Sequence, residues 1–267
     1  MLPKVTATGL RLGKGEPVKR DFTLLAVLWT VLAILSAWGV STFGWYLYPT
    51  HGAEEATIVD DAFTILSYMA VPVVALVIGI ELVAIMRFRS KGEPTEDGAR
   101  LTGEGNLPKF WLIVTSALAV VMIIWPGLTG IVELAHHKEP DLRIKITGQM
   151  WAWTVEYPDK GVRIAAAQEF VLPIGQTVQV DVESKDVLHS FWVPAFRQKI
   201  DAVPGKTTTI YITPDRIGEK DSDIAYRLQC AELCGVGHSV MANPVKVVEQ
   251  RDFDSWLAGQ KQRAEAR

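Results

Sequence analysis

Apolar residues crowd into the first half of the chain, where they form three long runs. Residues 22–48 contain no charged residue in 27 positions, residues 62–86 contain one, and residues 107–134 carry charges only near their two ends. A helix that crosses the hydrocarbon core of a membrane needs about 20 predominantly apolar residues. Only helices and closed barrels satisfy their backbone groups inside lipid. The pattern therefore predicts three transmembrane helices.

Lysine and arginine residues set the expected orientation of these helices. Five of them fall in residues 1–21 and five in the loop 87–109, whereas the loop 49–61 has none. Positive loops stay in the cytoplasm, so residues 1–21 are expected to be cytoplasmic and everything after the third helix to lie outside. The first run follows a basic segment, so a cleaved signal peptide is an alternative. Its length argues against that, because the apolar core of a signal peptide spans about 7–15 residues.

The second half of the chain has a different pattern. From residue 141, short runs of alternating apolar and polar residues are separated by glycine and proline, and the last of them ends near residue 250. Such spacing is typical of a sandwich or barrel of β-strands. Residues 251–267 are polar and predict a terminal helix. The predicted architecture is a membrane anchor followed by one all-β domain, residues 141–250.

Composition excludes several classes of protein. The net charge is -3, with an isoelectric point near 6.0 and no basic stripe, which argues against nucleic-acid binding. Two cysteines are too few for a disulfide framework, and no C-x-x-C-H sequence for attaching a c-type haem is present.

The two cysteines lie in a segment rich in metal-ligand residues. Cys230 and Cys234 are followed by His238 and Met241, and His189 precedes them on a different expected strand. Thiolates, imidazoles and a thioether suit copper, and a mononuclear blue-copper site needs only one cysteine. The second cysteine suggests two copper ions bridged by two thiolates. A disulfide between the cysteines is the alternative.

Four motifs in order resemble those of subunit II of the haem–copper cytochrome c oxidases, which carries the binuclear CuA centre. They are the C-x-E-x-C-G-x-x-H-x-x-M signature at 230–241, the histidine motif at 186–194, the K-x-D-x-x-P-G segment at 199–205 and the aromatic motif at 148–157. The resemblance covers about 95 residues. It implies a cupredoxin-like Greek-key barrel for the exported domain.

The resemblance also implies roles for particular residues. The side-chain ligands of copper would be His189, Cys230, Cys234, His238 and Met241. Glu232 would ligate copper through its carbonyl, and its carboxylate would reach a magnesium ion at the contact with subunit I. Trp151 would be the residue through which electrons arrive from cytochrome c. For Glu232 a solvated carboxylate, and for Trp151 simple packing in the barrel, are the alternatives.

The sequence departs from the family pattern in three places. The family commonly has two transmembrane helices, so residues 22–48 are an addition. Pro108 stands where the family often has a glutamate that serves a proton channel, with Glu104 a weak substitute. In the aromatic motif, Met150 and Ala152 replace the usual glutamine and tyrosine.

The sequence thus leads to an expected function. It is that of a terminal-oxidase subunit in a bacterial-type inner membrane, which spans the membrane several times and holds its copper domain on the periplasmic side. It would accept electrons from a c-type cytochrome or similar donor and pass them to haem in subunit I, where oxygen is reduced and protons are translocated. A CuA-bearing subunit of a nitric oxide reductase would share these motifs. A copper-free quinol oxidase subunit and a membrane-anchored copper carrier are further alternatives, and the complete ligand set argues against the first of them.

Overall fold

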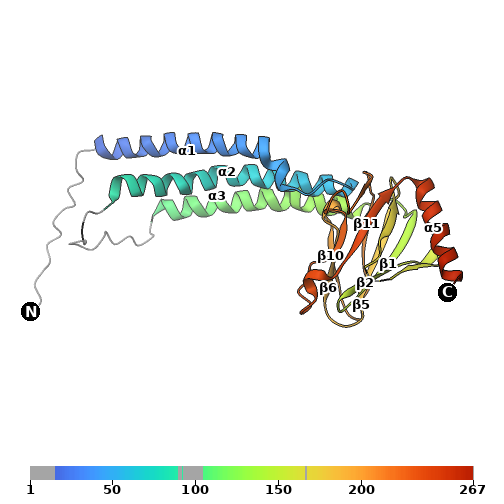
Figure 1. Ribbon diagram of the computed structural model, residues 1–267. Helices are drawn as coiled ribbons and strands as arrows, with labels where there is room; N and C mark the ends of the chain where they lie inside the picture. The colour runs from blue at the N-terminus through green and yellow to red at the C-terminus, as the bar shows by residue number, and fades with distance from the viewer. Residues whose placement is uncertain (1–15, 90–91, 93–104, 166, 267) are drawn as a thin grey trace, which may run out of the picture. The chain divides into compact units, whose positions relative to one another are not determined.

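The structure is a computed structural model that describes residues 16–89, 92, 105–165 and 167–266 (Figure 1). It divides into two compact units, residues 1–45 with 65–115, and residues 46–64 with 116–267. The first is helical. The second contains the β domain, the polar start of the second long helix and the part of the third from residue 116 onward.

Three helices are long and apolar enough to cross a membrane. They comprise α1 (Glu16–Phe43), α2 (Glu54–Phe88) and α3 (Asn106–Met122), the last extended by a π-helical segment (Ile123–Leu128) and α4 (Thr129–Ala135). A short 3-10 turn, η1 (Gly44–Leu47), follows α1. The predicted cytoplasmic segment 1–21 lies outside the described residues as far as residue 15.

Two of these helices begin earlier than the apolar runs that predicted them. Helix α1 starts at Glu16 instead of residue 22, and α2 starts at Glu54 instead of residue 62. Glu54 and Glu55 occupy the first turn of α2, where negative charge is favourable because of the helix dipole. A search for unbroken apolar residues misses such polar helical turns outside the membrane core.

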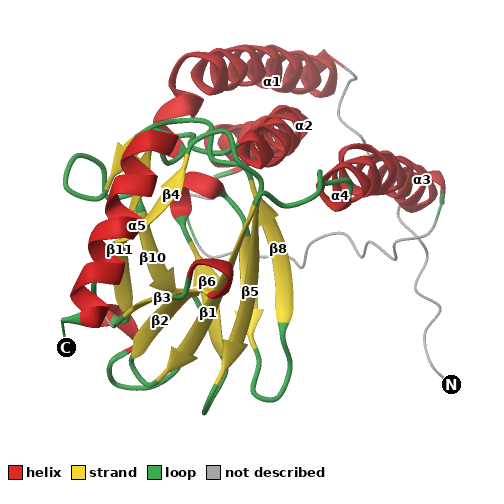
Figure 2. Ribbon diagram, turned by 90° about the vertical axis from the view of Figure 1, so that its right-hand side faces the viewer, coloured by secondary structure: helices red, strands yellow, loops and turns green. Residues whose placement is uncertain are grey.

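The β domain consists of two sheets (Figure 2). The first has the order β3-β2-β1-β5-β8 and the second the order β4-β11-β10-β6-β7, with β9 paired to β11. Their bounds are β1 (Leu142–Gln149), β2 (Ala152–Tyr157), β3 (Val162–Ile164), β4 (Phe170–Pro173), β5 (Val178–Ser184), β6 (His189–Trp192), β7 (Lys199–Ala202), β8 (Thr208–Ile212), β9 (Gly218–Glu219), β10 (Arg227–Cys230) and β11 (Ala242–Val248). Most neighbours are antiparallel, but β1 with β5 and β4 with β11 are parallel.

Alternating side chains of these strands form the core of the domain. In β2 and β5 every second residue is buried, and the same holds for β11. The terminal helix α5 (Gln250–Glu265) packs against β3 and β4 with Phe253 and Leu257 buried. The buried hydroxyl of Tyr157 donates to the Val171 carbonyl (2.7 Å) and accepts from the Val171 N–H (3.1 Å). The predicted fold class, apolar helices followed by an all-β domain, is confirmed.

Residues 49–55, which we call the tie segment, follow η1 and Tyr48, include the first two residues of α2, and belong to the second unit. The Gly52 N–H donates to the Ala195 carbonyl (3.0 Å), and the Glu54 N–H donates to the Thr213 carbonyl (2.9 Å). The segment therefore has backbone partners in the β domain although it forms no strand of its own.

Arg197 holds the same segment through the hydrogen bonds of its guanidinium group. Its Nε and Nη2 donate to the two carboxylate oxygens of Asp60, at 2.7 and 3.0 Å. Its other bonds go to three backbone carbonyls, those of Pro49 (2.6 Å), Thr50 (3.2 Å) and Pro194 (2.8 Å). The Arg197 side chain is only 8% exposed, so this is a nearly buried, fully hydrogen-bonded guanidinium.

Candidate metal centre

Two neighbouring strands bring the upstream histidine to the cysteine segment. His189 begins β6, and Cys230 ends β10 directly opposite Phe191 of β6. Residues two apart on a strand point to the same face of the sheet, so His189 and Cys230 share a face. Their 41-residue separation along the chain is closed by this pairing.

The ligand loop, residues 230–241, folds back on itself. The Cys230 N–H donates to the Met241 carbonyl (3.0 Å), which places the two ends of the loop side by side. Near the middle, the His238 N–H donates to the Gly235 carbonyl (3.1 Å) and opens the short helical turn η5 (His238–Val240). Residues that lie up to eleven positions apart in the sequence therefore face one point.

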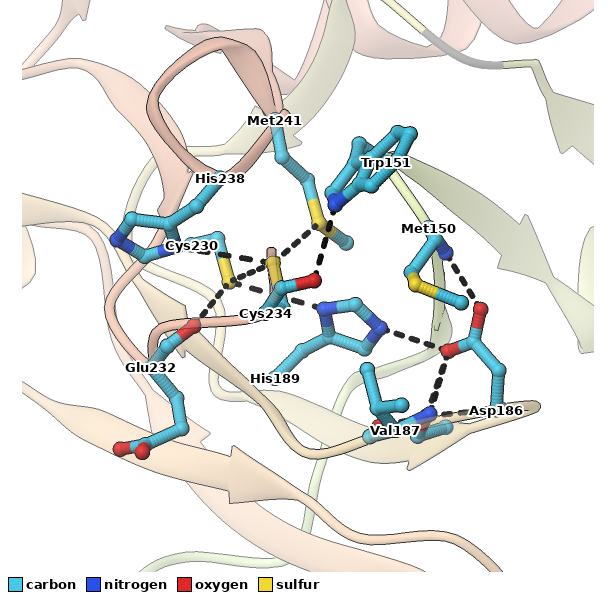
Figure 3. Close-up of polar contacts among 11 residues, drawn as sticks. Met150, Trp151, Asp186, Val187, His189, Cys230, Glu232, Cys234, His238 and Met241 are labelled. Atoms are coloured by element: carbon cyan, nitrogen blue, oxygen red, sulfur yellow. Dashed lines mark hydrogen bonds and ion pairs between the residues drawn. The ribbon is translucent and has the colours of Figure 1, made fainter. Parts of the chain in front are cut away.

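The donor atoms of the predicted ligands gather around the two sulfurs (Figure 3). The Sγ atoms of Cys230 and Cys234 are 3.7 Å apart. Cys230 Sγ lies 3.8 Å from His189 Nδ1, while Cys234 Sγ lies 3.6 Å from His238 Nδ1 and 3.9 Å from Met241 Sδ. His189, Cys230 and Cys234 each offer a ligand atom within 4.8 Å of the others, and all three are buried.

Both cysteines are free thiols in this arrangement. A disulfide would require the sulfurs to be about 2.05 Å apart, well below the 3.7 Å observed. The pKa of the Cys234 thiol is raised to about 11, mainly by burial and, to a smaller extent, by the hydrogen bond and the charge of Cys230. Soft metal ions bind the thiolate and displace its proton, and the set of sulfur and imidazole donors fits copper.

The backbone carbonyl and the side chain of Glu232 point in different directions. Its backbone carbonyl accepts from the Cys230 thiol at 3.3 Å, so the carbonyl oxygen belongs to the donor cluster. Its side chain is exposed, and the carboxylate points away from the sulfurs (Figure 3). The structure thus places the carbonyl where the sequence predicted a ligand and leaves the carboxylate free to face another group.

Asp186 holds His189 in place and was missed as a site residue by sequence reasoning. One carboxylate oxygen lies 2.8 Å from His189 Nε2, which leaves Nδ1 facing the thiols. The carboxylate also accepts the N–H groups of Met150 and Val187, both at 2.7 Å. Burial alone would raise the pKa of Asp186, but these hydrogen bonds hold the pKa below its usual value. The signal was its place three residues before His189, because a ligating histidine usually has such a partner.

Trp151 lies directly against the ligand loop. Its indole N–H donates to the Cys234 carbonyl at 3.0 Å, and the residue is 41% exposed. A Cβ added at Gly237 would lie 2.5 Å from Trp151 Cγ and Cδ2, so a glycine is required for the loop to approach the ring. Trp153, by contrast, is fully buried. Of these two tryptophans, only Trp151 joins the surface to the cluster.

Two residues were candidates for a proton channel in the sequence. Pro108 lies in the first turn of α3. Glu104 lies outside the described residues.

A β domain with these sulfur and imidazole donors, together with three apolar helices, defines a membrane-anchored copper protein of the cupredoxin-like class. Comparison with known proteins agrees. The family described as "Cytochrome C oxidase subunit II, periplasmic domain" matches residues 160–249.

Individual relatives give the same result. The chain is 30% identical to the alternative cytochrome c oxidase subunit 2 of Bradyrhizobium diazoefficiens, over 76% of this chain and 80% of that one. It is 28% identical to cytochrome c oxidase subunit 2 of Thermostichus vulcanus, over 86% and 84%. The chain belongs to the cytochrome c oxidase subunit II family.

Comparison with solved structures gives the crystal structure of the periplasmic domain of oxidase subunit II from Bradyrhizobium japonicum, with 32% identity over 47% of this chain and 97% of that one and a TM-score of 0.43.

Membership in this family has direct consequences. The protein is a subunit of an oxidoreductase complex, its family uses copper, and subunit I of the oxidase is its family partner. It is a membrane protein with an outward-facing β domain.

Proposed function

We propose that the chain is the electron-accepting subunit of a terminal oxidase. It takes electrons one at a time from an external c-type cytochrome or equivalent donor and passes them to haem in subunit I, where oxygen reduction is coupled to proton translocation. The observation that carries the proposal is the convergence of two thiols, two imidazoles, a thioether and a carbonyl on one point.

The number of donors favours a binuclear CuA centre. A mononuclear blue-copper site uses one thiolate, two imidazoles and one weak axial ligand. The cluster has a second thiol and a carbonyl beyond that set. The two cysteines, the two histidines, Met241 and the Glu232 carbonyl would hold the copper, which would supply reversible one-electron chemistry, while the protein fixes its geometry and electronics.

The surrounding residues of the chain prepare this site. Asp186 orients His189 and keeps its Nδ1 toward the thiols. Trp151 offers an exposed aromatic edge whose N–H is bonded to the Cys234 carbonyl, so we assign it as the point where electrons enter. The exposed carboxylate of Glu232 is assigned to a magnesium ion at the contact with subunit I. The N-terminus is assigned to the cytoplasm of a bacterial-type cell, with the copper domain on the periplasmic side.

Metal analysis and EPR of the purified full-length chain test the proposal. We expect two copper ions per chain that share one unpaired electron. A mononuclear spectrum, or no copper after reconstitution, overturns it. Met241→Leu should keep both ions and shift the reduction potential, because a thioether is a weak ligand. Complete loss of copper in that variant contradicts the assigned role of Met241.

The assigned route for electrons has a separate test in the assembled oxidase. Trp151→Phe removes the indole N–H but keeps an aromatic ring. We expect its copper content to stay at the wild-type level while the rate of copper reduction by a c-type cytochrome falls at least tenfold. An unchanged rate would place electron arrival elsewhere. Oxygen consumption by the same complex separates an oxidase from a nitric oxide reductase.

A further inference from the structure

Helix α1 is the part of the chain that the family pattern leaves without a role. We propose that α1 stays in the mature protein as a third transmembrane helix, docked on α2 through a built contact surface. The proposal stands on the helical unit and the tie segment, and it does not depend on the copper centre. Two independent sets of contacts support it. The first joins α1 to α2, and the second joins the tie segment, which follows α1 in the chain, to the β domain.

The first contact is an ion pair at the charged ends of the two helices. Arg87 Nε lies 2.8 Å from Asp21 Oδ1, with the side chains 32% and 21% exposed. Asp21 follows Lys19 and Arg20, and Arg89 follows Arg87, so both helix ends carry the positive charge that marks the cytoplasmic side. The ion pair therefore joins α1 and α2 as antiparallel neighbours with their charged ends together.

The second contact lies deep in the apolar part of the pair. The Trp29 indole N–H donates to the Pro72 carbonyl at 2.8 Å. Trp29 comes ten positions after Lys19, which at 1.5 Å per residue places it roughly 15 Å along the helix, about half of a 30 Å hydrocarbon core. No water satisfies a polar group there. The hydrogen bond to a carbonyl of α2 therefore favours an orientation in which this indole faces α2 and not lipid.

Between these two contacts the helices approach closely at a small residue. A Cβ added at Gly79 would lie 3.3 Å from Leu25 Cδ1 and within 4.0 Å of the Trp29 backbone. Small residues at such crossings let the backbones of membrane helices pack tightly. The three contacts run in one antiparallel order, from Asp21 with Arg87 through Leu25 with Gly79 to Trp29 with Pro72.

The segment that follows α1 is hydrogen-bonded to the β domain. The tie segment is bonded to the β domain through Gly52 and Glu54, and Arg197 binds the carbonyls of Pro49 and Thr50. Only the turn η1 and Tyr48 separate α1 from that bonded segment along the chain. A chain cut in this short connection would keep the tie segment and lose α1.

Intact mass and N-terminal sequencing of the chain purified from membranes give the first test. We expect a mature protein that still contains residues 16–43. A mature N-terminus after Phe43 overturns the proposal. This result does not depend on copper, so it is distinct from any failure of the oxidase assignment.

Docking is tested by cutting the folded chain. A protease site inserted after Leu47, which is 84% exposed, allows α1 to be severed in mild detergent. We expect the α1 fragment to remain bound through size-exclusion chromatography. The released fraction should rise at least threefold in the variant Asp21→Asn with Trp29→Phe, and the swap Asp21→Arg with Arg87→Asp should retain the fragment.

The matched control for these variants is Trp38→Phe. Trp38 is 59% exposed, and its ring contacts Phe43 of the same helix, so its removal should leave release unchanged. Equal release from the wild type and from the Asp21→Asn, Trp29→Phe variant would show that these contacts do not hold α1 on α2. That outcome overturns the docking surface.

Discussion

The ligand loop and the tie segment are both irregular stretches held to the same β domain, yet they are held by different interactions. The tie segment is held by hydrogen bonds between nitrogen and oxygen of 2.6 to 3.2 Å. Arg197, which donates two of them, also forms a bidentate ion pair with Asp60 of α2. The contacts at the centre of the ligand loop involve sulfur and span 3.3 to 3.9 Å. Neutral thiols are weak hydrogen-bonding groups. The tie segment therefore has its hydrogen bonds without any bound group, whereas a bound metal would add most to the stability of the ligand loop.

This difference separates two sources of stability. The bonds of the tie segment form when the protein folds and need nothing else. The donors of the ligand loop are brought together by strand pairing, and a metal that binds only the folded state adds its binding free energy to stability. Four changes test the distinction.

Arg197→Ala should have the largest effect. It leaves the Asp60 carboxylate and three carbonyls without their shared donor, and breaking a buried charge pair in this way costs about 3–5 kcal/mol. Thermal unfolding of the copper-free chain measures the loss. Arg143→Ala, at an exposed position of β1, is the control and should change stability by less than about 0.5 kcal/mol. If Arg197→Ala loses as little stability as the control, the bonds of Arg197 to the tie segment and Asp60 do not stabilise the fold.

Copper should stabilise the wild-type chain by about 4 kcal/mol at a free concentration 1,000 times its dissociation constant. The measurement is the unfolding transition with and without copper. Cys234→Ser removes one sulfur donor and should abolish most of the gain, while Arg197→Ala should keep it. Equal stabilisation of the wild type and Cys234→Ser would mean that copper acts at another place.

Gly237→Ala should cost about 1–3 kcal/mol in the copper-free protein, as expected when a methyl group is forced into a packed contact. The new Cβ would meet the Trp151 ring at 2.5 Å. Ser239→Ala, exposed in the same loop, is the control. Combining Gly237→Ala with Trp151→Ala should relieve the clash, so a purely additive double variant would contradict the contact.

Asp186→Asn should leave folding nearly unchanged and weaken copper binding by about 10- to 100-fold, the usual cost of removing the partner of a ligating histidine. Competition with a copper chelator measures the affinity. Asp201→Asn, at an exposed position of β7, should bind copper as the wild type does. Normal affinity in Asp186→Asn would show that the His189 ring is held by packing alone.

The three helices, the β domain and four side-chain ligands were predictable from the sequence because apolar runs and a compact motif are local signals. His189 lies 41 positions before that motif, and its own upstream motif was needed to include it. Helix ends were less predictable, since Glu54 and Glu55 extend α2 with polar turns. Arg197 and Asp60 are 137 positions apart, and no local pattern links them. The bond from Trp151 to the Cys234 carbonyl spans 83 positions and likewise depends on how the two sheets pack.

The separation of His189 from Cys230 also sets an order of events in biogenesis. The two residues meet through the antiparallel pairing of β6 with β10, and non-local strand pairing is intrinsically slow because the loop-closure entropy must be overcome first. Until that pairing forms, the chain can present only the ligands of one short loop together. Copper delivered at that stage would find a partial set of donors, so the strands must pair before the whole centre can be filled.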